Sequence, residues 1–150
     1  VQTTSPASPV AWIVDDGDAG FATSGSWTLP MVFNGRHNDL RNHAAGSGAN
    51  TATWTFTGLA AGEYSIAATW LEHSNRATNA PFRVLDGSGG SELDSVLVNQ
   101  ESAPNDFDDR GSSWENLFTV TITGTELVVE LSDDANEYVI ADAIRVVSTA

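Results

Sequence analysis

The sequence predicts an all-β domain, and within that class a two-sheet β-sandwich of jelly-roll type with about nine strands. After Ala11, apolar and polar residues alternate with a period of two, as in strands that have one buried face. Clusters of Gly, Pro, Asn and Asp separate the alternating runs. Valine and threonine crowd these runs, and no segment shows the repeat of an amphipathic helix.

Four runs alternate most clearly. In 51–56 the apolar face carries Trp54 and in 63–70 it carries Ile66, so both side chains are expected in the core. Runs 118–123 and 127–131 are expected to form a hairpin across a Gly-Thr turn. The remaining expected strands are 11–15, 26–32, 81–85, 95–99 and 138–147. The stretches without alternation, 33–48, 86–93 and 100–113, are expected to be loops.

The length of 150 residues suits one domain, which we place at 11–150. Residues 1–10 are rich in Thr, Ser and Pro and are expected to be a linker or a mature N-terminal arm. The formal net charge is −14, with no lysine and no cysteine. So acidic a chain repels phosphate backbones and anionic lipids, which argues against nucleic-acid binding and membrane partners. No apolar run is long enough for membrane insertion.

Three phrases are similar to a known family: Ile13-Val-Asp-Asp-Gly-Asp-Ala-Gly-Phe21, Ser74-Asn-Arg-Ala-Thr-Asn-Ala-Pro81 and Tyr138-Val-Ile-Ala-Asp-Ala-Ile-Arg-Val146. Together with shorter Trp and Gly-Glu-Tyr phrases, they make 11–148 resemble the golvesin C-terminal-like domain, which also occurs at the end of some xanthan lyases. The resemblance implies a β-sandwich of carbohydrate-binding-module type that is appended to secreted enzymes and bacterial surface proteins. Residues 33–48 and 101–113 depart from the usual pattern of that family.

Catalysis is not expected. The chain has no cysteine, no Gly-x-Ser-x-Gly and no His-Glu-x-x-His, so the common nucleophile and metalloprotease motifs are absent from its sequence. The twenty acids leave paired carboxylates open for glycoside hydrolysis, but nothing singles out two of them. His37 and His43, with Asp39 between them, could clasp zinc, although solvated loop histidines are far commoner.

Calcium is the cofactor that the acid clusters favour, because Ca²⁺ takes hard oxygen ligands gathered in turns. The stretch 106–111 begins like an EF-hand loop, but its later positions do not fit that motif. The alternative is turn chemistry, since Asp-Gly and Asp-Asp pairs also favour tight turns. The candidate calcium ligands are Asp106, Asp108 and Asp109, followed by Asp16 and Asp18.

Asp142 shares its phase in the closing strand with Ile140 and Ile144, so alternation turns its carboxylate inward. A buried carboxylate needs a cation or several hydrogen-bond donors. Arg76, in the most specific of the shared phrases, is the expected partner, and this pair would be structural. The alternative is an aspartate at a strand edge that reaches water.

Sugar binding needs aromatic rings that are free to stack on pyranose faces. The rings that alternate as core are excluded, and those at strand ends or in loops remain. The candidates are Trp114, Trp27, Phe107 and Tyr138, for each of which packing in the core or at its rim is the alternative.

We therefore expect a non-catalytic extracellular module, secreted or on a bacterial cell surface, that binds a polysaccharide. The alternative is a structural subunit, such as a repeat of a surface adhesin or a self-assembling filament. In that second case the N-terminal arm of one copy would pack into another copy.

Overall fold

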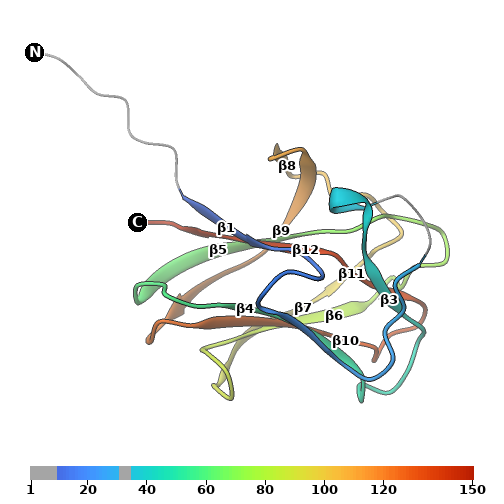
Figure 1. The fold of residues 1–150 in the computed structure, drawn as a ribbon, viewed down its shortest axis with the longest axis horizontal. Helices are drawn as coiled ribbons and strands as arrows, with labels where there is room; N and C mark the ends of the chain where they lie inside the picture. The colour runs from blue at the N-terminus through green and yellow to red at the C-terminus, as the bar shows by residue number, and fades with distance from the viewer. Residues whose placement is uncertain (1–9, 31–34) are drawn as a thin grey trace, which may run out of the picture.

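The computed structural model describes residues 10–30 and 35–150, and the expected all-β sandwich is confirmed (Figure 1). Within these residues there are twelve strands, not about nine, and one short 3-10 helix, η1 (Arg36–Asn38). The expected N-terminal arm is 1–10, and all of it except residue 10 lies outside the described residues. No helix among the described residues has the length and apolar character needed to cross a membrane.

Two five-stranded sheets form the sandwich, and neighbouring strands in them are antiparallel. The first sheet has the order β1–β12–β5–β9–β8, with bounds Ala11–Val14, Ala143–Ser148, Gly62–Thr69, Ser112–Ile122 and Phe107–Asp109. The second has the order β2–β4–β10–β6–β7, with bounds Phe21–Ser24, Thr51–Phe56, Leu127–Ser132, Ala80–Leu85 and Glu92–Val98. β3 (Arg41–His43) pairs with β11 (Val139–Ala141) at one end of the sandwich (Figure 1).

The core lies between the two sheets and follows the alternation of the sequence. In β4 the burial alternates at every residue, so Trp54 is 1% exposed while the threonines beside it are half-buried. Ile66 of β5 and Val129 of β10 are buried in the same cluster. Burial of each such side chain stabilises the fold by roughly 1.5–3 kcal/mol. The core therefore fixes the two sheets and carries the loops between them.

A register shift in the first sheet explains an element that alternation did not predict. Between β5 and β9 the pairing shifts at Ile66/Ala67, as at a β-bulge. Beyond the shift, Trp114 of β9 packs with Ala67 and Ala143 in a second small cluster, apart from the main core. Phe107 of β8 pairs opposite Trp114 and covers this cluster. The expected loop 100–113 therefore contains a strand and the start of another.

Other expected elements also differ in detail. The hairpin expected between 118–123 and 127–131 is wrong, because β9 and β10 lie in different sheets and do not pair. In place of the strand expected at 26–32, β2 lies earlier in the chain, and of the expected range the described part 26–30 holds only an isolated bridge at Thr28. The expected loop 33–48 contains η1 and β3. The closing strand expected at 138–147 is interrupted at Asp142, where it passes from the small sheet to the first sheet. That interruption is where the candidate site lies.

Candidate functional site

Four aspartates meet where β1, η1 and the last two strands converge. Asp15 and Asp16 follow β1 directly, Asp39 follows η1, and Asp142 separates β11 from β12. Each aspartate offers one carboxylate oxygen, and these four oxygens all lie within 4.8 Å of one another. Asp15, Asp16 and Asp142 are each only 2% exposed. The fold thus gathers four acids from three separate parts of the chain into one acid cluster.

Glycine at position 35 allows the backbone to approach this acid cluster. The Arg36 backbone N–H donates to Asp142 Oδ2 at 2.9 Å. Gly35 has φ of 93°, in the left-handed region that favours glycine, and a Cβ there would lie 2.5 Å from the carbonyl oxygen of Asp39. On the other side, Trp54 Nε1 donates to the Asp142 carbonyl oxygen at 3.1 Å. Asp142 is therefore fixed both through its carboxylate and through its backbone.

Three buried carboxylate oxygens in the acid cluster have no hydrogen-bond partner among the described residues: Asp16 Oδ1, Asp39 Oδ1 and Asp142 Oδ1. Burial is the main reason that the pKa of Asp142 is raised to about 10, and the adjacent Asp15 and Asp16 raise it further. Burial and repulsion from Asp39 and Asp15 raise the pKa of Asp16 to about 8. Without a cation, the acid cluster holds protons at neutral pH.

Two basic side chains partly offset the acid cluster. Arg41 Nε lies 3.3 Å from Asp16 Oδ2, and His37 Nδ1 lies 3.1 Å from Asp15 Oδ2. Each contacts one oxygen of one carboxylate and leaves the unpartnered oxygens uncovered. A divalent cation with oxygen preference, such as Ca²⁺, suits the remaining oxygens, since it binds six to eight of them and water completes its shell. The residues present therefore fit a calcium ion.

The other predicted calcium ligands lie elsewhere or have other contacts. Asp106 and Asp108 accept hydrogen bonds from β9, and Asp109 Oδ2 is bound by Arg145 at 2.7 Å. The hydrogen bond from Arg145 outweighs desolvation and lowers the pKa of Asp109. Asp18 Oδ2 accepts a hydrogen bond from the backbone N–H of Asp15, just after β1. Of the five predicted ligands, only Asp16 joins the acid cluster, and the stretch 106–109 leads into and forms strand β8.

The predicted partner of Asp142 is wrong, although its burial agrees with the strand phase. Arg76 Nε donates to the Leu71 carbonyl oxygen at 3.1 Å, and its guanidinium also binds Asn75. The interruption between β11 and β12 turns Asp142 toward Arg36 and the acid cluster instead. Strand alternation cannot foresee this change of direction.

The zinc site considered for the loop is not formed among the described residues. His37 faces Asp15, whereas His43 lies 3.4 Å from Asp133 and also contacts the Ala44 carbonyl oxygen. The two histidines therefore contact different carboxylates, because His37 lies in η1 and His43 lies in β3.

The predicted sugar-stacking aromatics are mostly not free. Trp114 is fully buried, and its Nε1 donates to the Asp109 carbonyl oxygen, so it cannot stack on a sugar. Phe107 lies under the Arg145 guanidinium, 4.9 Å from the ring centroid. Trp27 is half-buried against His43, and Tyr138 remains 39% exposed.

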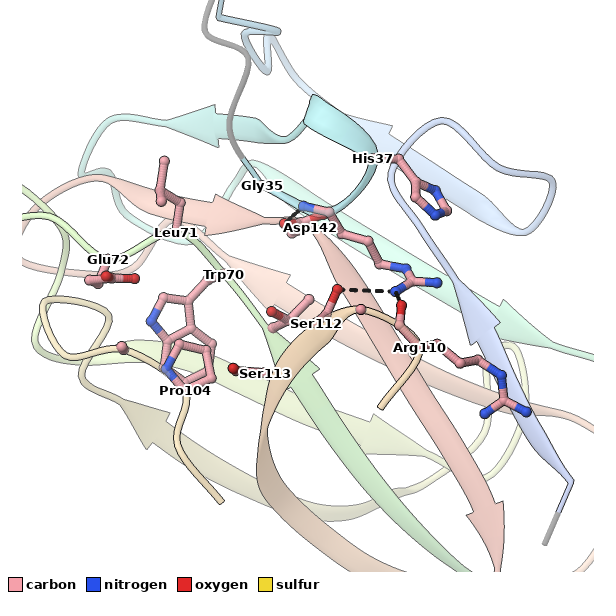
Figure 2. A pocket seen from close by; sticks show the side chains of 14 residues that line it. Gly35, His37, Trp70, Leu71, Glu72, Pro104, Arg110, Ser112, Ser113 and Asp142 are labelled. Atoms are coloured by element: carbon pink, nitrogen blue, oxygen red, sulfur yellow. Dashed lines mark hydrogen bonds between the residues drawn. The ribbon is translucent and has the colours of Figure 1, made fainter. Parts of the chain in front are cut away.

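A pocket of about 450 Å³ adjoins the acid cluster. None of the sequence patterns predicted this pocket. It lies between η1, the segment that follows β5, and the turn between β8 and β9. Asp142 and Gly35 line one side, and Glu72, Ser112 and Ser113 line others (Figure 2). The lining is mainly polar side chains and backbone, and its size lies within the roughly 300–1,000 Å³ of small-molecule sites.

Comparisons with known proteins agree with this architecture. The chain is 29% identical over 144 residues to a xanthan lyase of Bacillus sp. (strain GL1), covering 91% of this chain and 14% of that protein. The solved structure of a Paenibacillus xanthan lyase matches with a TM-score of 0.74 at 30% identity, covering 93% of this chain and 13% of the other. The chain thus spans a small part of these enzymes.

A family 35 carbohydrate-binding module from Cellvibrio japonicus matches with a TM-score of 0.63 at 15% identity, covering 94% of this chain and 95% of the module. The chain therefore has the fold of a carbohydrate-binding module. The family model of the Golvesin C-terminal domain matches residues 12–148. The chain therefore belongs to the Golvesin C-terminal domain family.

Proposed function

We propose that this domain is a non-catalytic extracellular module that binds a polysaccharide in the pocket between η1 and the β8–β9 turn. The observation that carries the proposal is a polar pocket of about 450 Å³ at the loop end of a carbohydrate-binding-module fold. Serine hydroxyls, a glutamate and arginines line it, and these groups hydrogen-bond sugar hydroxyls. The xanthan lyase relatives act on a polysaccharide by name, which supports the same class of ligand.

Affinity gel electrophoresis against a panel of bacterial and algal polysaccharides tests this proposal. At least one polymer should retard the wild-type domain. The double variant Ala103→Leu, Ser113→Leu places apolar bulk on the pocket wall and should abolish the retardation. Ser95→Leu, at a second pocket on the second sheet, is the matched control and should still be retarded. No retardation of the folded wild type by any polymer would refute the function.

We also propose that a calcium ion held by the acid cluster stabilises the domain. The three unpartnered buried oxygens support this, because such atoms cost about 1–3 kcal/mol each when nothing binds them. An ion there would tie the turn after β1 to η1 and to the break between β11 and β12. It would thereby brace the wall of the pocket, which Asp142 shares.

Terbium, which occupies calcium sites, offers a direct probe of binding. Trp54 donates a hydrogen bond to the Asp142 backbone, so an indole lies beside the acid cluster. Excitation of tryptophan should therefore sensitise terbium emission, and calcium should quench that emission by competition. Asp16→Asn should weaken both effects, whereas Asp108→Asn in β8 should leave them unchanged.

The alternative of a structural subunit that associates through its N-terminal arm stays a prediction. Sedimentation analysis of the chain with and without residues 1–9 tests it. A concentration-dependent oligomer that the deletion abolishes would favour that alternative.

A further inference from the structure

The pocket between η1 and the β8–β9 turn collects positive charge in a strongly acidic protein. Two of the six arginines, Arg36 and Arg110, line it. Asp142 is buried beneath it and bound by a backbone N–H, which leaves Glu72 as the exposed acid of the lining. The second pocket, by contrast, has one arginine among three acids. A net charge of −14 makes this local excess of cationic side chains distinctive.

The guanidinium of Arg36 has no carboxylate within 4.0 Å among the described residues. Four other arginines lie within 4.0 Å of an acidic side chain: Arg41, Arg83, Arg110 and Arg145. Arg36 instead donates through Nη1 to the Arg110 carbonyl oxygen at 2.9 Å and to Ser112 Oγ at 3.0 Å (Figure 2). Its Nε is buried without a partner. The cation is therefore held in place by neutral acceptors and not neutralised.

Trp114 and Asp142 also hold Arg36 in position. Its guanidinium carbon lies 5.7 Å from the centroid of the Trp114 ring, which is fully buried. Its backbone N–H is bound to Asp142, so η1 cannot move away without breaking that contact. A guanidinium held this way loses little further freedom when it binds a ligand, and its fork matches the oxygens of an anionic group.

We propose that the pocket takes a saccharide that bears an anionic group, carboxylate or sulfate, and that Arg36 recognises that group. This inference rests on the proposed polysaccharide binding and names the chemical class of its ligand. The anion would supply the counter-charge that Arg36 lacks within the protein. Glu72 and the serine hydroxyls would then face the sugar hydroxyls. The overall charge of −14 opposes any non-specific attraction to a polyanion, so binding would have to come from this site.

Matched pairs of polymers test the inference. Affinity electrophoresis compares polygalacturonate, alginate and hyaluronan with the same polymers after reduction of their carboxylates to hydroxymethyl groups. A carrageenan and its desulfated form make the sulfate arm. We expect at least about tenfold tighter binding to one acidic form than to its neutral counterpart, as for a hydrogen bond to a charged group. Added salt should weaken that preference.

Arg36→Gln should remove the preference, so that the affinities for the acidic and the neutral form become equal. Arg83→Gln removes the same charge at the second pocket and should change neither. An unchanged melting temperature shows that each variant is folded. Equal binding to acidic and neutral forms would overturn the inference while the proposed function stands, whereas no binding to any polymer would refute the function itself. A preference that survives Arg36→Gln but disappears in EDTA would assign the anion to a bound metal and would also overturn the inference.

Discussion

Asp142→Asn should have opposite effects with and without calcium. Without metal, the folded state must hold a proton on this carboxyl, because burial raises its pKa to about 10. Asparagine has nearly the same shape, needs no proton and still offers an oxygen to the Arg36 backbone N–H. The variant should therefore stabilise the metal-free protein. With calcium present, the same change removes a charged ligand and should destabilise the bound form.

The size of the effect follows from proton linkage. Between the unfolded pKa of 3.8 and a folded pKa above the working pH, the folded state binds one more proton than the unfolded state. Its stability then falls as the pH rises, by about 1.36 kcal/mol per pH unit. At about pH 7.5 this amounts to at most about 5 kcal/mol for Asp142. We expect Asp142→Asn to recover about 2–4 kcal/mol in EDTA, or roughly 5–15 °C in melting temperature.

Melting curves in EDTA, in millimolar calcium and in sodium chloride of equal ionic strength measure both effects. In wild type, calcium at a hundred times its Kd should add about 2.7 kcal/mol beyond sodium. Asp142→Asn should lose that increment, and Asp108→Asn, a matched change of charge outside the acid cluster, should keep it. If Asp142→Asn lowers the melting temperature equally in all three buffers, the carboxylate serves only as a hydrogen-bond acceptor and the reasoning fails.

Three further outcomes are expected. Gly35→Ala should destabilise by about 1–3 kcal/mol, because its φ is positive and a Cβ would meet the Asp39 carbonyl oxygen; thermal melting measures this. Trp114→Ala should cost about 3–5 kcal/mol in urea unfolding, as removal of a buried ring does. In EDTA, wild-type stability should fall as the pH rises from 3.8 toward about 8, through Asp16. With calcium it should instead fall as the pH is lowered, because protons compete for the carboxylates.

The sandwich could be predicted because period-two alternation reports burial directly. Trp54 and Ile66 lie in the core for the reason that the pattern implies. Trp114 was misplaced because a bulge shifts the register of β9, and no local feature of the sequence marks that shift. Strands β3 and β8 have only three residues each, too few for a period to appear.

The acid cluster could be predicted only in part. Asp16 stood out because it lies in a run of acids, and Asp142 because it interrupts an apolar strand. Asp15 lies in the same run but was assigned to the end of the first expected strand, and Asp39, which has no acidic neighbour, carries no comparable signal. Their meeting depends on contacts between segments more than a hundred residues apart, such as Arg36 with Asp142. Sequence spacing therefore favoured the dense stretch 106–109, where each carboxylate already has a local partner.

The proposed calcium site and the proposed saccharide pocket share Asp142. Variants of this residue and of Arg36 can therefore separate the two proposals in the same protein. Its carboxylate lies in the acid cluster, and it also lines the pocket whose cation is Arg36. If calcium only braces the fold, Asp142→Asn in EDTA should still bind the anionic saccharide, because Arg36 and its neutral acceptors remain. If the metal instead contacts the ligand, calcium removal should abolish binding in wild type at a temperature where the domain stays folded. Arg36→Gln and Asp142→Asn would then give different patterns, the first changing ligand preference and the second changing stability.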